Sequence, residues 1–291
     1  MPHQIGFVEA GGGKLAHQKM LEVVATFAAA NGWTVLRFDT TQAQHELLLK
    51  APGLSGTEEI FVGMRTYENA SSDFYNLTAA GFTGHVPGAA FTAQPGVILS
   101  GVPAHNQRID YWLTLNGQRL VLAMKVGTPV YESMYLGKML PYARPSQYPY
   151  PVVVGGMLNG EANTRFSDAT HTCWIKGGSG RAVGGSATFR NMQMRFNDGT
   201  WKTPEAFPWN SSSLCGTNQQ ARESNGIYPL TSVVLSDATS GVFGELDGVF
   251  HITGFDNSVE NTLLIDGKTY VVFQDVARTG HIDYYAIAME P

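Results

Sequence analysis

Charge is what this sequence most lacks. Only 15% of its 291 residues are charged, against roughly 25% in ordinary soluble domains. The net charge is −5 and no basic run occurs, which argues against binding to nucleic acid or to an anionic membrane surface. Aromatic, Ser, Thr and Asn side chains are plentiful instead. Such a surface resembles one that partner proteins cover, although a β-rich protein with many uncharged turns has a similar composition.

Cysteine and long apolar runs are also scarce. Cys173 and Cys215 are the only cysteines and make no disulfide framework, so we expect free thiols in a reducing cytoplasm, while their pairing stays open. No apolar stretch approaches the roughly 20 residues that a membrane span needs. The first residues lack a basic segment followed by an apolar one, so we expect no secretory signal. These absences together predict no membrane association.

The common motifs for cofactors, metals and nucleophiles are missing as well. The stretch EAGGGK suggests a phosphate-binding loop, but that motif needs Ser or Thr after Lys14 and glycine five positions before Gly13. The sequence has Leu15 and Val8 there. The eight histidines form neither H-x-H nor H-E-x-x-H, and no G-x-S-x-G elbow occurs. We therefore expect no cofactor, no metal and no catalytic residue, and a protein that is not an enzyme.

One amphipathic helix is predicted near the start of the chain, over residues 14–31. Its apolar residues recur on one broad face at the 3.6-residue spacing of a helix. Asn31 and Gly32 then provide the left-handed conformation that commonly ends a helix. Before this helix, the three glycines predict a pliable hinge, through which residues 1–10 reach a neighbouring chain.

The rest of the sequence predicts antiparallel strands. Asn116-Gly117, Asp198-Gly199 and Asp266-Gly267 each separate alternating segments, and we expect a tight hairpin turn at each, with positive φ angles at Asn116-Gly117. The expected fold class is α+β and mostly β, with one N-terminal helix and two related antiparallel β-meander domains. The clearest strands of the first half are expected at 33–39, 45–50, 58–67 and 73–82.

The two ends of the chain resemble each other. Residues from Phe38 and residues from Phe255 each contain Phe-Asp, a Leu-Leu strand, an Arg-Thr pair and an Asp-aromatic-Tyr sequence. A duplicated meander explains this similarity, although unrelated strand–turn–strand sequences also look alike. Three segments are expected: 1–145 with the helix and a β domain, 146–230 as a proline-rich strap and loop-rich insertion, and 231–291 as a C-terminal β domain that echoes residues 38–80. The first and third segments are expected to pack either separately or as one unit.

Aromatic residues are the only candidates for functional side chains. Such residues stack on sugars, anchor protein interfaces or fill a core, and the interface and core interpretations are favoured over sugar stacking. The tentative interface anchors are Tyr111, Trp112, Tyr131, Tyr135, Tyr148 and Tyr150.

Three long phrases resemble a family of virion structural proteins of tailed bacteriophages. They are EEIFVGMRTYENASSDFYNL, the stretch from GVPAHNQRIDYWLTLNG to YPYPVVVGG, and the stretch from GELDGVFHITGFDNSVEN to ARTGHIDYYAI. The resemblance is weakest from about residue 157 to residue 226. It implies no catalytic residue, because proteins of this kind are described only as structural.

This resemblance implies a virion protein made in the host cytoplasm, whose partners are copies of itself and other virion proteins. A subunit with two like domains builds a symmetric ring when head-to-tail contacts close. We expect a ring at the neck, as a collar or tail-terminator protein of the tail-completion region. The alternatives are a baseplate or tail-tip protein and, from another class, a receptor- or glycan-binding module.

Overall fold

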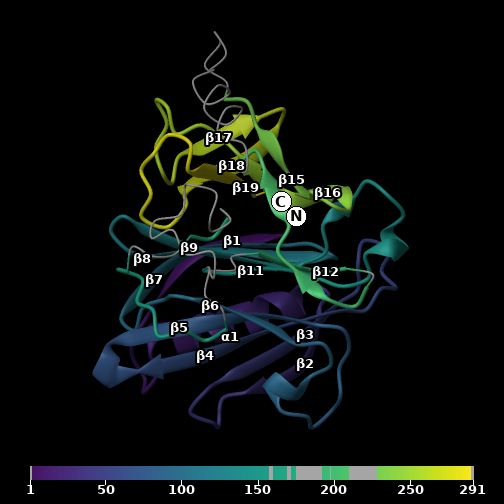
Figure 1. Ribbon diagram of the computed structural model, residues 1–291. Helices are drawn as coiled ribbons and strands as arrows, with labels where there is room; N and C mark the ends of the chain where they lie inside the picture. The colour runs from purple at the N-terminus through teal and green to yellow at the C-terminus, as the bar shows by residue number, and fades with distance from the viewer. Residues whose placement is uncertain are drawn as a thin grey trace.

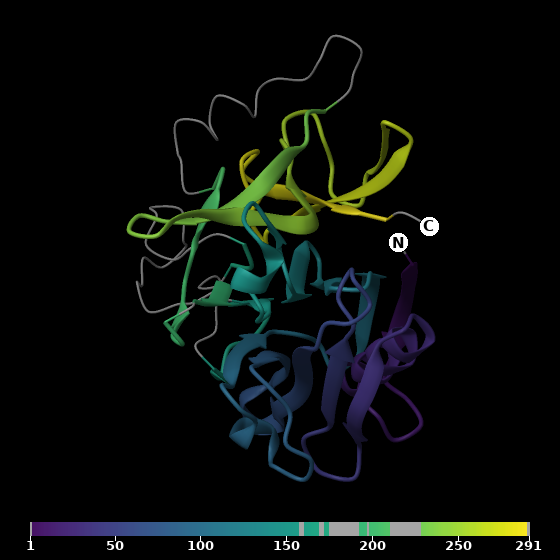
Figure 2. The same cartoon turned by 90° about the vertical axis from the view of Figure 1, so that its right-hand side faces the viewer.

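The computed structural model describes residues 2–156, 160–168, 172–174, 192–196, 198–209 and 228–289. Within these residues the chain forms three antiparallel β-sheets and one α-helix. The sheets are stacked as layers, with the C-terminal strands above, a middle sheet between, and the strands that follow the helix below (Figures 1 and 2). The two termini lie close together in both views. The expected fold class, α+β and mostly β with one helix, is confirmed.

The helix α1 (Ala16–Ala30) matches the predicted amphipathic segment. Its buried face packs against strands of the middle sheet and of the sheet below, so the helix fills the space between two layers. At its end, the Asn31 side chain donates to the carbonyl of Phe27 at 2.8 Å. Gly32 takes a φ of +86°, as the left-handed stop requires.

The N-terminal sheet is a five-stranded meander in which each strand pairs with the next along the chain. One face joins the main core with residues such as Leu47 and Val62. The other face carries a smaller apolar cluster that includes Phe82 and Phe91. Its strands are β2 (Thr34–Asp39), β3 (Glu46–Ala51), β4 (Ile60–Asn69), β5 (Phe74–Phe82) and β6 (Ile98–Val102), with short 3₁₀ turns at Ala70–Ser72 and Phe91–Ala93.

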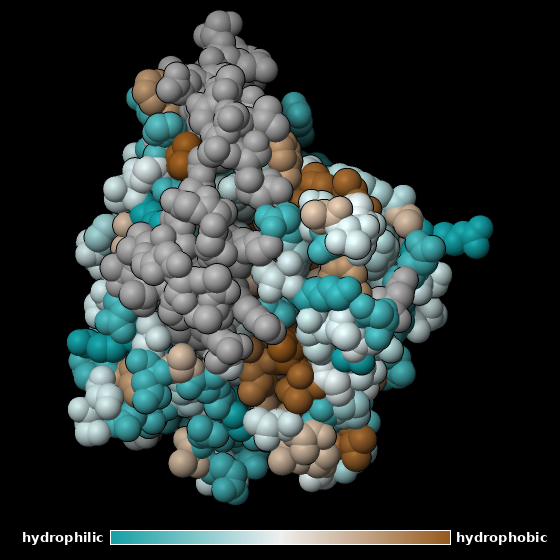
Figure 3. Space-filling model, in the orientation of Figure 1, coloured by the Kyte–Doolittle hydropathy of each residue, from teal (hydrophilic) through white to brown (hydrophobic). Residues whose placement is uncertain are grey.

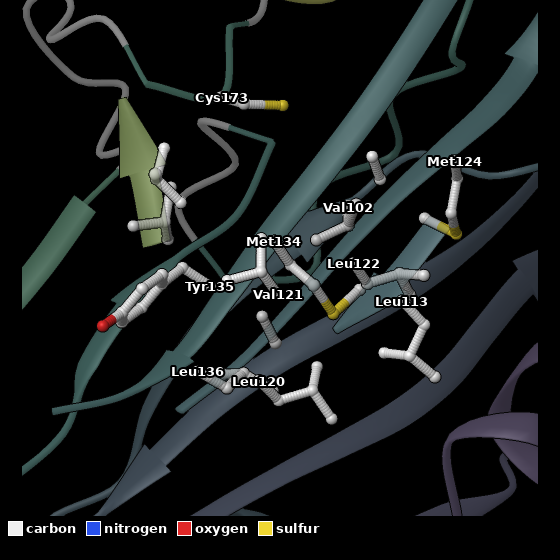
Figure 4. Packing of buried hydrophobic residues seen from close by; sticks show 14 of the residues in the cluster. Val102, Leu113, Leu120, Val121, Leu122, Met124, Met134, Tyr135, Leu136 and Cys173 are labelled. Carbon is white, nitrogen blue, oxygen red and sulfur yellow. The ribbon is translucent and has the colours of Figure 1, made fainter. Parts of the chain in front are cut away.

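The middle sheet is covered by protein on both faces. Leu113, Leu122 and Met134 lie beside Val102 of β6 on one side (Figure 4). The alternate residues face the C-terminal sheet, where Trp112 contacts Phe273. The strand order is β1 (His3–Glu9), β7 (Arg108–Leu115), β8 (Arg119–Gly127), β9 (Val130–Gly137), β11 (Val152–Val154), β12 (Met192–Arg195) and β13 (Trp201–Lys202).

The C-terminal sheet forms the third layer. Its path ends at β14 and at β17, and the short strand β10 pairs with β16 beside the main path. The strands are β10 (Leu140–Pro141), β14 (Glu205–Phe207), β15 (Thr231–Asp237), β16 (Gly241–His251), β17 (Thr262–Ile265), β18 (Lys268–Gln274) and β19 (Tyr284–Ala288), and a 3₁₀ turn at Pro145–Gln147 follows β10.

Of the predicted hairpin turns, the one at Asp266-Gly267 forms as expected and the one at Asn116-Gly117 forms differently, while the connection at Asp198-Gly199 includes a residue outside the described ones. Asp266 and Gly267 join β17 to β18 with φ angles of +51° and +75°. At Asn116-Gly117 the hairpin forms, but neither residue takes the positive φ that we expected. The Asn116 side chain instead accepts hydrogen bonds from the backbone N–H groups of Gln118 and Arg119, at 2.9 and 3.0 Å. An Asx turn therefore replaces the tight two-residue turn.

The predicted echo corresponds to two three-stranded meanders. Strands β3–β4–β5 and strands β17–β18–β19 are each consecutive antiparallel neighbours, and Asp73 and Asp283 each directly precede the last strand. The sheets do not follow the predicted segment boundaries at 145 and 230. Strands β11–β13 from the middle segment extend the middle sheet, β10 and β14 join the C-terminal sheet, and one apolar cluster includes residues of all three segments.

Candidate interaction surface

The predicted aromatic anchors lie mainly in the core. Tyr111 and Trp112 are 3% and 8% exposed, while Tyr131 and Tyr135 are 2% and 0% exposed. These four residues fill the core, which is one of the two interpretations favoured from the sequence, because layers of protein cover both faces of the middle sheet there. Alternation along a strand separates side chains onto two faces, but it does not reveal that both faces are covered.

The other two tyrosines are partly buried. Tyr148 packs at a steep angle against Phe243, with ring centres 6.0 Å apart. The Arg195 guanidinium lies 5.4 Å from the centre of the Tyr150 ring. Both residues therefore have partners within their own chain, and the role of anchor for these two stays a prediction.

A buried ion pair connects the middle sheet to the C-terminal sheet. Arg119 of β8 is fully buried, and its Nε lies 3.7 Å from Oδ2 of Asp247 in β16. The same carboxylate oxygen accepts from Asn116 Nδ2 at 2.6 Å and from Gln118 Nε2 at 3.1 Å. The Tyr135 hydroxyl accepts from the Asp247 backbone N–H at 3.3 Å. This network connects the middle sheet to the C-terminal sheet through side chains of both.

A second buried polar cluster lies between β9, β18–β19 and residues 172–174. Oδ1 of Asp275 accepts from the Cys173 backbone N–H at 2.6 Å. The Cys173 thiol lies 3.8 Å from Oε2 of Glu132, and burial raises the pKa of that thiol well above its usual value. Burial, with the nearby carboxylates, also raises the pKa of Asp275 from 3.8 to about 7. Cys173 is a free thiol, whereas Cys215 lies outside the described residues.

This raised pKa gives a testable pH dependence for Asp275. Because the folded pKa lies above the unfolded one, the contribution of this group to stability is complete below about pH 4 and is lost as the pH rises through about 7. We expect the free energy of unfolding to fall by about 2–4 kcal/mol from this group across that range. Asp275→Asn keeps the acceptor for Cys173 and should remove this component, measured by denaturant unfolding at both pH values. Equal pH slopes in wild type and variant would contradict the assignment.

Among the described residues, no group of three or more His, Cys, Asp or Glu side chains is placed to hold a metal ion. Within the same residues no helix is long and apolar enough to cross a membrane.

His17 is the most buried histidine of the helix region, and its Nε2 lies 2.7 Å from Oε2 of Glu68. This contact connects α1 to β4, so His17 has a structural role between the helix and the N-terminal sheet.

The opening stretch of the chain is not a hinge. Gly12 and Gly13 take φ angles of +63° and +79°, and Gly11 and Lys14 exchange backbone hydrogen bonds across them, which makes a tight turn. The residues before the turn form strand β1, which pairs along its whole length with β7. The prediction of a pliable hinge at these glycines is therefore wrong, because the alternation of HQIGFVE matches a strand whose Val8 side is covered by α1.

Strand β1 forms one edge of the middle sheet and presents an apolar surface there. Ile5 and Phe7 are 54% and 55% exposed, although both belong to the face that elsewhere carries Trp112. The C-terminal sheet covers Trp112 but leaves these two side chains to solvent. The Arg108 guanidinium lies 4.1 Å from the centre of the Phe7 ring and pairs with Glu9 at 2.6 Å. We call these residues, His3 to Glu9 with Arg108, the β1 edge.

A groove continues the β1 edge onto the helix. It is lined by Gln4 and Val8 of β1 and by Lys19, Glu22, Val23 and Thr26 of α1, and it has a volume of 320 Å³. Its lining is mixed rather than apolar, since a lysine and a glutamate border it. On the face shown in Figure 3, hydrophobic side chains occur as separate patches in both the upper and the lower half of the molecule.

No family model matches the chain, and no curated protein matches it significantly. The β1 edge is thus identified from geometry alone. The sequence signal that identifies it was available, because the alternation of apolar and polar residues in HQIGFVE is that of a strand. The adjoining glycines are typical of a flexible segment as well as of a tight turn, and so obscure this signal.

Proposed function

We propose that this chain is a non-enzymatic structural subunit of a tailed-phage virion, which assembles with copies of itself and with other virion proteins. The observation that carries the assembly role is the β1 edge, a regular strand at the end of the middle sheet with two exposed apolar residues, Ile5 and Phe7. Exposed strand edges of this kind are templates for pairing with another chain, and proteins ordinarily protect them. The virion part of the proposal rests on the resemblance of the long phrases.

The position that we propose within the virion is the neck, where the subunit forms a symmetric ring as a collar or tail-terminator protein. A ring of such subunits contains two similar meanders for each subunit, so its apparent rotational symmetry is higher than the number of subunits. The baseplate or tail tip is the second position for which the same architecture is suitable. The burial of Tyr111, Trp112, Tyr131 and Tyr135 weighs against a glycan-binding module, because buried rings give no platform for stacking on a sugar.

A nonsense codon early in the gene, compared with a synonymous change at the same codon, tests the proposal. Particles are purified from both infections and examined by mass spectrometry and negative-stain electron microscopy. We expect the nonsense mutant to yield particles that lack the chain and have incomplete or detached tails. Normal infectious particles that lack the chain would contradict the proposal, and a purified chain that binds glycans on an array would favour the alternative class.

A further inference from the structure

The backbone of β1 shows which of its groups face outward. Leu115 donates to the carbonyl of Pro2 at 3.1 Å, and Ala10 donates to the carbonyl of Gln107 at 2.7 Å. Backbone groups alternate in direction along a strand, so the carbonyl of Pro2 and the N–H and C=O groups of residues 4, 6, 8 and 10 turn toward β7. The N–H and C=O groups of residues 3, 5, 7 and 9 therefore point away from the sheet. No strand pairs with this side among the described residues.

From this arrangement we infer that β1 pairs antiparallel with β1 of a second copy, about a two-fold axis at Gly6. The contact joins the two middle sheets into one continuous sheet. The inference deepens the proposed function and rests on it, since it names the surface through which copies of the chain meet. An identical patch on both subunits is the defining property of a two-fold interface.

The register follows from the outward-facing groups. Antiparallel strands exchange hydrogen bonds between residues that both point outward, so odd residues must lie opposite odd residues. With Gly6 on the axis, Ile5 of one copy lies opposite Phe7 of the other, and this apolar pair occurs twice. Aromatic and β-branched residues are favourable cross-strand partners, worth about 0.2–1 kcal/mol for each pair. The pairing covers the two apolar side chains that the fold leaves exposed.

Neighbouring registers bring fewer apolar side chains together. A shift by two residues in one direction would place Ile5 opposite Ile5 but Phe7 opposite His3. A shift in the other direction would place Phe7 opposite Phe7 but Ile5 opposite Glu9, so that a carboxylate faces an apolar side chain. Each shifted register therefore has one apolar pair, whereas the register about Gly6 has two.

The other sheet edges fit a partner strand less well. Strands β13, β14 and β17 have two, three and four residues, which makes them short templates. Strand β2 is interrupted by an irregularity between Val35 and Arg37. Beside β6, Gly101 already donates to the carbonyl of Gly160 at 2.8 Å. Strand β1, with seven residues, is the longest regular strand at a sheet edge that the structure describes. A ring built with this contact consists of two-fold-related pairs of subunits, and a second contact joins each pair to the next.

Light scattering of the purified full chain at tens of micromolar tests the contact. Phe7→Pro removes one N–H group that points away from the sheet and keeps the N–H groups that bond to β7, a change that an edge strand tolerates. Ile5→Asp keeps every backbone group and changes only the exposed side chain. We expect a wild-type dimer and at least a tenfold weaker dimer in both variants, with circular dichroism and melting temperature close to wild type. Leu264→Asp, which changes an exposed apolar residue on the β17 edge (74% exposed), is the matched control and should leave the dimer intact.

The register has its own test. Ile5→Cys and Phe7→Cys chains, each with Cys215→Ser, are oxidised separately and as a mixture. Disulfide-linked dimers should form several-fold faster in the mixture, and equal rates would overturn the register. A wild-type chain that stays monomeric, or β1 variants that dimerise as wild type does, would overturn the contact itself. If the chain is monomeric but present in virions, the contact is contradicted and the proposed function is not. If the chain dimerises through β1 but is absent from virions, the contact is supported and the proposed function is contradicted.

Discussion

Replacing Trp112 with alanine should lower the free energy of unfolding by about 3–5 kcal/mol, the usual cost of truncating a buried aromatic residue. Trp112 is 8% exposed, and its ring meets Phe273 at a steep angle with centres 5.1 Å apart. The ring therefore fills the space between the middle sheet and the C-terminal sheet. Its removal leaves a cavity between two layers that are each fixed by their own hydrogen-bond ladders, so the site has little freedom to collapse.

Denaturant unfolding of the purified chain measures this effect. The matched control is Tyr142→Ala, because Tyr142 is an aromatic residue that is 61% exposed, and its change should stay within about 0.5 kcal/mol. Trp112→Phe should fall between the two, since it keeps part of the contact with Phe273. A loss at Trp112→Ala as small as that of the control would mean that Trp112 faces solvent, as the anchor interpretation requires.

Replacing Arg119 with methionine should destabilise the fold by a similar amount, about 3–5 kcal/mol. The guanidinium is fully buried, and Asp247 is the carboxylate beside it. Methionine fills much of the space but leaves the largely buried Asp247 carboxylate without its positive partner, with Asn116 and Gln118 as its side-chain donors. Most of the expected loss comes from this uncompensated charge rather than from the lost attraction.

A second substitution separates these two causes. Arg119→Met combined with Asp247→Leu removes both charges, and the double variant should be more stable than Arg119→Met alone. Lys50→Met is the control for loss of an ion pair, because Lys50 pairs with the exposed Glu59 and should change stability by less than about 1 kcal/mol. A double variant that is less stable than Arg119→Met would show that the polar network itself stabilises the joint between the sheets.

Local patterns in the sequence predicted local structure well. The 3.6-residue spacing located α1, and the alternating segments located β2–β5 to within a few residues. Asp266-Gly267 predicted its turn because a two-residue connection between strands demands positive φ, which glycine and aspartate tolerate. At Asn116-Gly117 the same signal misled, because the Asn116 side chain offered the backbone another set of hydrogen bonds.

What the sequence did not predict depends on contacts between distant segments. Tyr135 looked like a possible anchor because its own strand does not show that β16 lies above it, more than a hundred residues later in the chain. The assignment of β1 failed for a related reason, since its partner β7 follows about a hundred residues later. Glycines next to a short strand are consistent both with a tight turn and with a hinge. Only the pairing partner decides between them.

The claim on which this account depends is that the chain is an assembled part of a virion. An electron-microscopy map of the intact particle whose genome encodes it tests this most directly. The account predicts density at the neck that fits the three stacked sheets, repeated around the tail axis, with residues 3–9 of each copy beside those of another. A particle map at side-chain detail in which every protein density is assigned to other chains would contradict it.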